Sequence, residues 1–343
     1  MIVSKGIGFV RMLEWSGLHM VVLLLTSSAV AALYHLEIIA VEIPWLPISV
    51  IGTAVAFYIG FKNNQSYDRM WEARKIWGGI INQSRVWGMQ VDGYISNTFN
   101  KDIDEKQLAE IKQRLIYRHL AWLYTHREQL LVPTSWEHIS QKGMVAHTAG
   151  HFQRNFGLGL IEDEVAEIKL SNFIKGPELE QLEVAKNKAT QIINEQSRDL
   201  AALRKLEVIE DFRHMELVAV LGKFYELQGK NERIKKFPLP RQYSSSSKIF
   251  TNIFLFLLPF SMVPAMMELG NVGLWLSIPI TALISWVYLT MEGVGDYSEN
   301  PFQGMANDIP MLSLCRTIEI DLRQMLKETE LPKPIAAKKD ILM

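Results

Sequence analysis

The residues best suited to catalytic or metal chemistry in this sequence are few and scattered. His147 and His151 have the i, i+4 spacing that can place two imidazoles on one helix face, where they could bind a metal ion. The other histidines are dispersed along the chain, so no third ligand is indicated, and the single cysteine, Cys315, excludes an intramolecular disulfide. The sequence contains no GxSxG, GxxxxGK or GxGxxG motif. We therefore predict a protein that is not an enzyme and has no resident metal or cofactor.

A second kind of chemistry, the control of water in a narrow passage, is indicated by three residues at four-residue intervals. Thr53, Phe57 and Phe61 share one slowly drifting face if this stretch is helical. A ring of apolar side chains expels water and blocks ions until the passage widens. The alternative is ordinary packing against lipid or a neighbouring helix, and the residues alone leave both open.

Four segments are apolar enough to position such residues in a membrane. The segments span 15–36, 43–61, 249–267 and 269–291, and none contains Asp, Glu, Lys or Arg. The length of each is close to the roughly 20 apolar residues that a helix needs to cross a bilayer. The first could be mistaken for a signal peptide, but it is longer than a typical apolar signal region and has no clear cleavage site. The sequence therefore predicts four transmembrane helices.

The distribution of basic residues predicts the orientation of these helices. The two short connections around 37–42 and 268–271 contain no Lys or Arg, whereas basic residues cluster at the other ends of the helices. By the positive-inside rule, both termini and the middle of the chain are cytoplasmic. The totals of 36 Lys and Arg against 37 Asp and Glu give no indication of a nucleic-acid partner.

The charged middle of the chain has helical rather than strand periodicity. In the stretch QLAEIKQRLIYRHLAWLY, Leu108, Ile111, Leu115 and Trp122 fall near one stripe. We therefore expect an all-α membrane protein with a cytosolic helical domain. The expected divisions are transmembrane helices 1 and 2 in 1–62, a cytosolic helical region in 63–248, transmembrane helices 3 and 4 in 249–291, and a cytosolic C-terminal segment in 292–343.

The stretch that follows the second apolar segment is dense in polar and aromatic residues. It includes Asn63, Asn64, Arg69, Trp71, Glu72 and Arg74. Trp, Tyr and basic residues favour the lipid headgroup layer, so these residues could be an interfacial anchor. The density of polar groups favours packing against another chain or domain.

Three blocks of the sequence resemble the signatures of the bestrophin family, most closely its prokaryotic branch. The blocks are FKNNQSYDRMWEARKIWG, NERIKKFPLPRQYS and ENPFQGMANDIPM. The resemblance implies a homopentameric channel of the bacterial inner membrane. Its partners would be membrane lipid, four copies of itself and permeant monovalent ions, either anions as in animal members or Na⁺ and K⁺ as in some prokaryotic relatives.

The resemblance also assigns candidate pore residues. The hydrophobic neck of the family corresponds to Thr53, Phe57 and Phe61, of which Thr53 departs from the bulky apolar pattern and predicts a wetter outer ring. A cytosolic constriction maps near Ile209 and Glu210, counted back from the FPLP block. Five Glu210 carboxylates facing the axis would favour cations, and the alternative is a solvated Glu on a charged helix.

The third block bears on calcium, which animal bestrophins bind through an acidic cluster after an Asn-Pro-Phe sequence. Asn300, Pro301 and Phe302 match that sequence, but no carboxylate follows before Asp308. Calcium requires several oxygen ligands, so we expect Asp296, Glu299 and Asp308 to make subunit contacts or helix caps instead. The rival to a channel is a membrane-anchored helical scaffold or a membrane enzyme without a pore.

Overall fold

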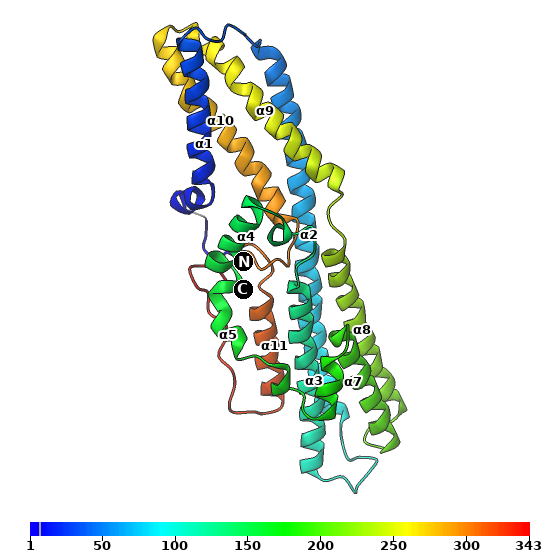
Figure 1. The fold of residues 1–343 in the computed structure, drawn as a ribbon. Coiled ribbons are helices and arrows are strands. Elements are labelled where there is room, and N and C mark those ends of the chain that lie inside the picture. Colours follow the sequence, from blue (N-terminus) through cyan, green and yellow to red (C-terminus); the bar gives the residue numbers. More distant parts are fainter. Residues whose placement is uncertain (7) are drawn as a thin grey trace. The chain divides into compact units, whose positions relative to one another are not determined.

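The computed structural model describes residues 1–6 and 8–343, and its secondary structure is helical (Figure 1). Among these residues, β-pairing is limited to isolated bridges that join Ile2 to Ile341 and Lys338 to Ile341. The chain divides into two compact units. We call residues 4–69 and 238–299 the membrane unit, and residues 1–3, 70–237 and 300–343 the charged unit.

The membrane unit contains the four apolar segments. Its helices are α1 (Phe9–His35), the first part of α2 (Trp45–Tyr94), α9 (Arg241–Met267) and α10 (Asn271–Ser298). Each of the four apolar stretches is long and apolar enough to cross a membrane, as the sequence predicts. Within this unit α10 packs along both α1 and α9 (Figure 1). The helices continue through Pro259, Pro264 and Pro279, as transmembrane helices can when neighbours satisfy the freed backbone groups.

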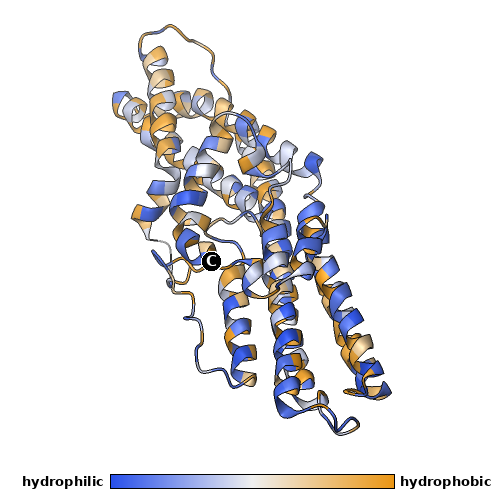
Figure 2. Ribbon diagram, turned by 60° about the horizontal axis from the view of Figure 1, so that its bottom comes forward, coloured by the Kyte–Doolittle hydropathy of each residue, from blue (hydrophilic) through white to orange (hydrophobic). Residues whose placement is uncertain are grey.

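The apolar residues of α2 divide between a buried and an exposed face. Ile48, Val55 and Ile59 are buried against Phe254, Leu258 and Met262 of α9. Other apolar side chains of the unit remain exposed, as expected for helices surrounded by lipid, and orange residues cover long stretches of helix in Figure 2. The contact between α2 and α9 fixes which residues of α2 face outward.

The charged unit is a bundle of helices joined by turns and loops. It comprises the rest of α2, α3 (Glu105–Leu131), η1 (His138–Ser140), α4 (Met144–Phe156), η2 (Leu158–Ile161), α5 (Glu162–Ala166), η3 (Leu170–Asn172), α6 (Pro177–Glu183), α7 (Lys188–Lys205), α8 (Asp211–Lys236) and α11 (Met311–Met325). The start of α3 is set by a capping box, in which Asp104 accepts from the Gln107 backbone and Gln107 accepts from the Asp104 backbone.

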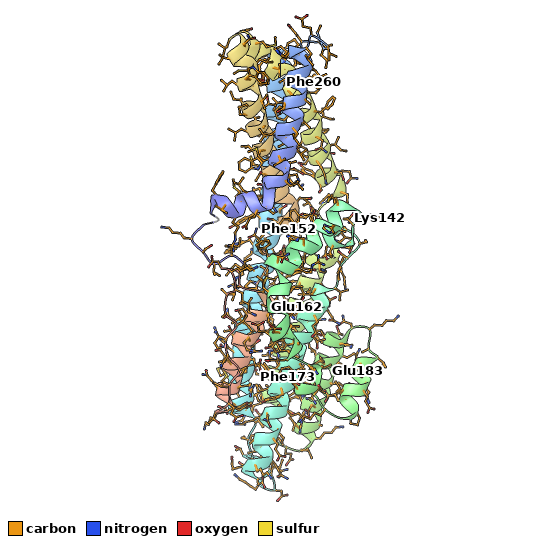
Figure 3. The ribbon with its side chains drawn as sticks, turned by 60° about the vertical axis from the view of Figure 1, so that its left-hand side comes forward. Lys142, Phe152, Glu162, Phe173, Glu183 and Phe260 are labelled. Carbon is orange, nitrogen blue, oxygen red and sulfur yellow. The ribbon has the colours of Figure 1, made fainter. Side chains whose placement is uncertain are left out.

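The core of the charged unit is rich in aromatic side chains. Trp77, Trp87 and Trp122 are almost completely buried. The ring of Phe173 stacks on that of Tyr124 with 5.4 Å between centroids, and Figure 3 shows Phe173 among the densely packed side chains. Large rings contribute much buried area for little conformational entropy, which explains how a charged sequence retains a substantial core.

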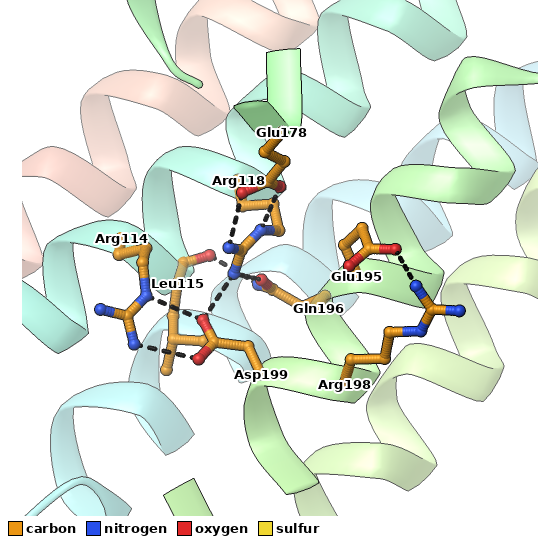
Figure 4. A network of polar contacts seen from close by, with 8 residues as sticks. All are labelled: Arg114, Leu115, Arg118, Glu178, Glu195, Gln196, Arg198 and Asp199. Carbon is orange, nitrogen blue, oxygen red and sulfur yellow. Dashed lines mark hydrogen bonds and ion pairs between the residues drawn. The ribbon is translucent and has the colours of Figure 1, made fainter. Parts of the chain in front are cut away.

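A buried arginine ties α3 to its neighbours in this unit (Figure 4). Arg118 donates to both carboxylate oxygens of Glu178, at 2.7 and 2.9 Å, and to Asp199 at 2.7 Å. It also donates to Gln196, whose own amide donates to the Leu115 carbonyl. Such a pairing offsets the cost of removing the guanidinium from water.

The boundaries between the two units fall after Val3, Arg69, Phe237 and Glu299. The divisions expected from the sequence, after 62, 248 and 291, follow composition and stay a prediction. α2 is one continuous helix of 50 residues. Its apolar segment ends at Phe61, but its residues belong to the membrane unit as far as Arg69. Pro238 and Pro240 separate α8 from α9, because proline lacks the N–H that continues a helix.

Candidate pore-lining face

The candidate neck residues lie on an exposed face of α2 in the membrane unit. Phe57 is 68% exposed and Phe61 is 61% exposed, although the intervening Ile59 is completely buried. The Phe57 and Phe61 rings lie 6.5 Å apart. Together with Ala56, Gly60, Asn63, Asn64 and Tyr67 they line an open groove along the helix. The structure thus brings the two phenylalanines together on a surface available to another copy or to lipid.

Thr53 is exposed one turn earlier, but its hydroxyl is already engaged. Its Oγ1 donates to the Ser49 carbonyl at 2.9 Å, within the same helix. The hydroxyl oxygen keeps its acceptor lone pairs, and the expectation of a wetter ring at Thr53 stays a prediction.

A buried ionic cluster fixes the rotation of α2 directly after Phe61. Lys62 is 0% exposed, and its Nζ lies 2.5 Å from Glu292 and 3.5 Å from Asp296, both on α10. The other oxygen of Glu292 accepts from the Ser247 hydroxyl on α9. A buried amine needs such partners because desolvation is costly. Since Lys62 must point inward, Phe61 beside it points outward.

The polar block after Lys62 has two kinds of role within the membrane unit. Asn63 donates to the Met291 carbonyl at 3.0 Å, and the absence of a side chain at Gly295 makes room for it. Arg69 donates to the Glu299 carbonyl at 2.8 Å. These contacts hold α2 against the end of α10, whereas Asn64 is exposed beside Phe61 in the groove.

The remaining residues of this block belong to the charged unit. Glu72 lies 2.5 Å from Arg233 of α8 in an exposed ion pair, which contributes little to stability. Trp71 is 51% exposed and Arg74 is half-buried. The predicted role of these residues in subunit packing stays a prediction.

The Asn-Pro-Phe block begins the last segment of the charged unit and is buried. Phe302 is 1% exposed, Asn300 is buried, and the Pro301 carbonyl accepts from the Ile309 amide at 3.3 Å. Asp308 accepts from the Gly304 and Met305 amides at 2.7 and 3.1 Å, which closes the loop. Burial raises the pKa of Asp308 to about 7. Among the described residues, no group of three or more His, Cys, Asp or Glu is placed to hold a metal ion.

The residues expected at the cytosolic constriction lie at the start of α8. Ile209 is 1% exposed and packs in the core of the charged unit. Glu210 caps α8, with its carboxylate accepting from the Phe212 and Arg213 amides at 3.4 Å each. Phe212, which sequence reasoning missed, is 77% exposed and borders the same depression as Glu210. An acidic cap followed by an apolar residue at the second helical position was the signal that could have identified it.

An all-helical architecture with four helices long and apolar enough to span a membrane is that of a helical membrane protein. Comparison with known proteins agrees. The family model for the bacterial and fungal bestrophin protein matches residues 15–324. The chain belongs to the bestrophin family, whose members are ion channels rather than enzymes.

Individual relatives and solved structures support this assignment. The voltage-dependent anion channel-forming protein YneE of Escherichia coli (strain K12) is 27% identical over 84% of this chain and 79% of its own length. A protein of Ralstonia nicotianae with the same description is 25% identical, with complete coverage of both chains. The crystal structure of a bacterial bestrophin homologue from Klebsiella pneumoniae has a TM-score of 0.70 at 20% identity, covering 91% of this chain and 98% of the other.

Proposed function

We propose that this protein is a homopentameric channel through which monovalent anions pass passively across the bacterial inner membrane. The observation that carries the proposal is the exposed Phe57 and Phe61 face of α2, held outward by buried Ile59 and Lys62. In a pentamer these side chains form two stacked apolar rings around the axis. Such rings stop ions by excluding water and conduct when they widen.

The residues next to the rings suit the polar end of the same pathway. Asn64 and Tyr67 continue the exposed face of α2 beyond Phe61. Their amide and hydroxyl groups can replace part of the hydration shell of an ion that leaves the apolar neck. Along this face, apolar Phe61 is followed by polar Asn64. Such a change suits the point where an apolar neck opens into a water-filled chamber.

For the second constriction we propose Phe212 rather than Ile209. Ile209 is already packed inside its own protomer, so its side chain is not free to meet four copies at an axis. Phe212 is exposed, and Glu210 and Asp211 lie beside it along the depression. An apolar ring flanked by carboxylates would then complete the cytosolic end of the pathway.

The orientation we propose has both termini and the charged unit in the cytoplasm. The basic residues flanking the four spans support it through the positive-inside rule. Residues near the two ends pair with each other, since the Leu342 amide donates to the Met1 carbonyl and the Val3 amide to the Asp340 carbonyl, each at 2.9 Å. One compartment therefore holds both ends.

Bilayer recording of the purified protein in asymmetric potassium chloride tests conduction and ion sign together. We expect a reversal potential near the chloride equilibrium potential, as the description of the relatives as anion channel-forming proteins suggests. Because five Glu210 carboxylates would disfavour anions, Glu210→Gln should move the reversal potential further towards chloride. A reversal potential near that of potassium would contradict anion selectivity, and no shift in the variant would remove the role of Glu210.

A further inference from the structure

Asp68 lies on the face of α2 that carries the candidate neck residues. Ile59, Lys62 and Ser66 are all 0% exposed and mark the side of this helix that packs within the membrane unit. Phe57 is exposed on the opposite side, and Asp68 follows it eleven residues later and is also exposed. Because an α-helix turns by about 100° per residue, eleven residues return the chain to within about 20° of Phe57. Asp68 therefore belongs to the same exposed row.

Asp68 determines the charge of this face. In the part of α2 that belongs to the membrane unit, all of which the structure describes, the charged residues are Lys62, Asp68 and Arg69. Lys62 is buried against Glu292, and Arg69 is half-buried and donates to the Glu299 carbonyl. Both cations are thus held against α10 and its end, and Asp68 is the one charged side chain of this stretch that is exposed. The exposed face therefore carries a negative charge.

The position of Asp68 along the helix is directly beyond the neck. Phe61, Asn64 and Asp68 follow one another at intervals of three and four residues, which keeps them in one row. With a rise of about 1.5 Å per residue, Asp68 lies about 10 Å beyond Phe61 along the helix axis. In a pore lined by this face, every ion that enters or leaves the apolar rings passes the level of Asp68, where low-dielectric walls strengthen the effect of a fixed charge.

We propose that Asp68 is a selectivity-determining residue of the channel, with one carboxylate from each copy forming a ring at the inner end of the neck. The inference rests on the proposed function, because it needs several copies of the α2 face around one axis. A ring of carboxylates attracts cations and repels anions. Asp68 therefore lowers the ratio of chloride to potassium permeability that the rest of the pathway sets, and it limits the anion preference of the channel without blocking conduction.

Reversal potentials of the full-length protein in asymmetric potassium chloride test this role. Asp68→Asn should raise the ratio of chloride to potassium permeability at least about threefold, because the ring loses its charge, and Asp68→Glu should keep the wild-type ratio. Glu14→Gln is the matched control, since it removes an exposed carboxylate from α1, outside the proposed pathway, and should leave the ratio unchanged. An unchanged ratio in Asp68→Asn, or an equal rise in Glu14→Gln, would overturn the proposal.

Thiol modification of Asp68→Cys provides a second arm in one and the same channel. Cys315 is the single cysteine of the chain and is buried, so the introduced thiol is the accessible one. A methanethiosulfonate reagent that adds a sulfonate should return the permeability ratio towards the wild-type value, and one that adds a quaternary ammonium should raise it further. No change with either reagent would contradict a position in the ion pathway.

The outcomes separate this inference from the proposed function. If Phe57→Ala/Phe61→Ala leaves the flux unchanged in folded protein, the pore-lining face itself is wrong, and the ring at Asp68 is wrong with it. If that double variant raises the flux but Asp68→Asn leaves the permeability ratio unchanged, the proposed function stands and the role of Asp68 alone is overturned.

Discussion

At the scale of single residues, the environment of each titratable or polar group matters more than its type. Lys62 and Arg118 are buried cations, and each has carboxylate partners within hydrogen-bonding distance. Asp308 is a carboxylate that works as a loop closure and not as part of an acidic cluster. Residue type therefore identifies candidates, and the partners decide their roles.

Asp308 makes the stability of the protein depend on pH. Its pKa is raised to about 7 in the folded state, from an ordinary value of 3.8. The folded state then binds more protons than the unfolded state between these values, so stability falls as pH rises from about 4 to about 7. The loss from this group is on the order of 4 kcal/mol at most.

Asp308→Asn should flatten this dependence, because the amide has no proton to lose. We expect chemical denaturation of the wild type in detergent to show lower stability at pH 8 than at pH 5, and the variant to show a clearly smaller difference. Equal slopes in the two proteins would show that Asp308 does not titrate in this range.

At the scale of elements, the rotation of α2 is the feature on which the candidate site depends. Ile59 packs against α9, Lys62 pairs with α10, and the two phenylalanines are left on the open side. Both restraints lie within the membrane unit and act on neighbouring residues. The apolar contact sets the approximate face, and the ion pair sets the rotation.

Loss of the Lys62 amine should therefore destabilise the protein. Lys62→Met leaves Glu292 buried without its cation, which typically costs about 3–5 kcal/mol. Glu72→Gln is the matched control, because it breaks the exposed pair with Arg233 and should cost less than about 1 kcal/mol. Unfolding in detergent measures both, and similar losses in the two variants would argue against the buried pair as the restraint on α2.

At the scale of the whole molecule, composition and hydropathy predict much of the fold. The four apolar segments correspond to four helices, and the lack of Lys and Arg in the two short connections predicts that both connections lie on the same side of the membrane. The continuation of α2 beyond Phe61 also agrees with the sequence, because no proline follows Phe61 within the helix, which continues through the adjacent Gly78 and Gly79. These features are predictable because they depend on local composition.

The parts that could not be predicted depend on contacts between distant residues. Counting back from a motif placed the cytosolic constriction near Ile209 and Glu210, but only the packing of the charged unit shows that the Ile209 side chain is buried and that of Phe212 is exposed. The partners of Lys62 are likewise more than two hundred residues away in the chain. No periodicity reports such pairs.

The central claim is that Phe57 and Phe61 close a pore formed by several copies of this chain. The direct test is to measure the anion flux from liposomes that contain the wild type, the Phe57→Ala/Phe61→Ala variant, or the control Phe256→Ala. Phe256 on α9 is 69% exposed, similar to the other two, but it lies outside the proposed pathway. We predict a flux at least about tenfold higher for the double variant, because smaller apolar rings hold water more readily, and an unchanged flux for Phe256→Ala. An unchanged flux from folded, pentameric double variant would contradict the account.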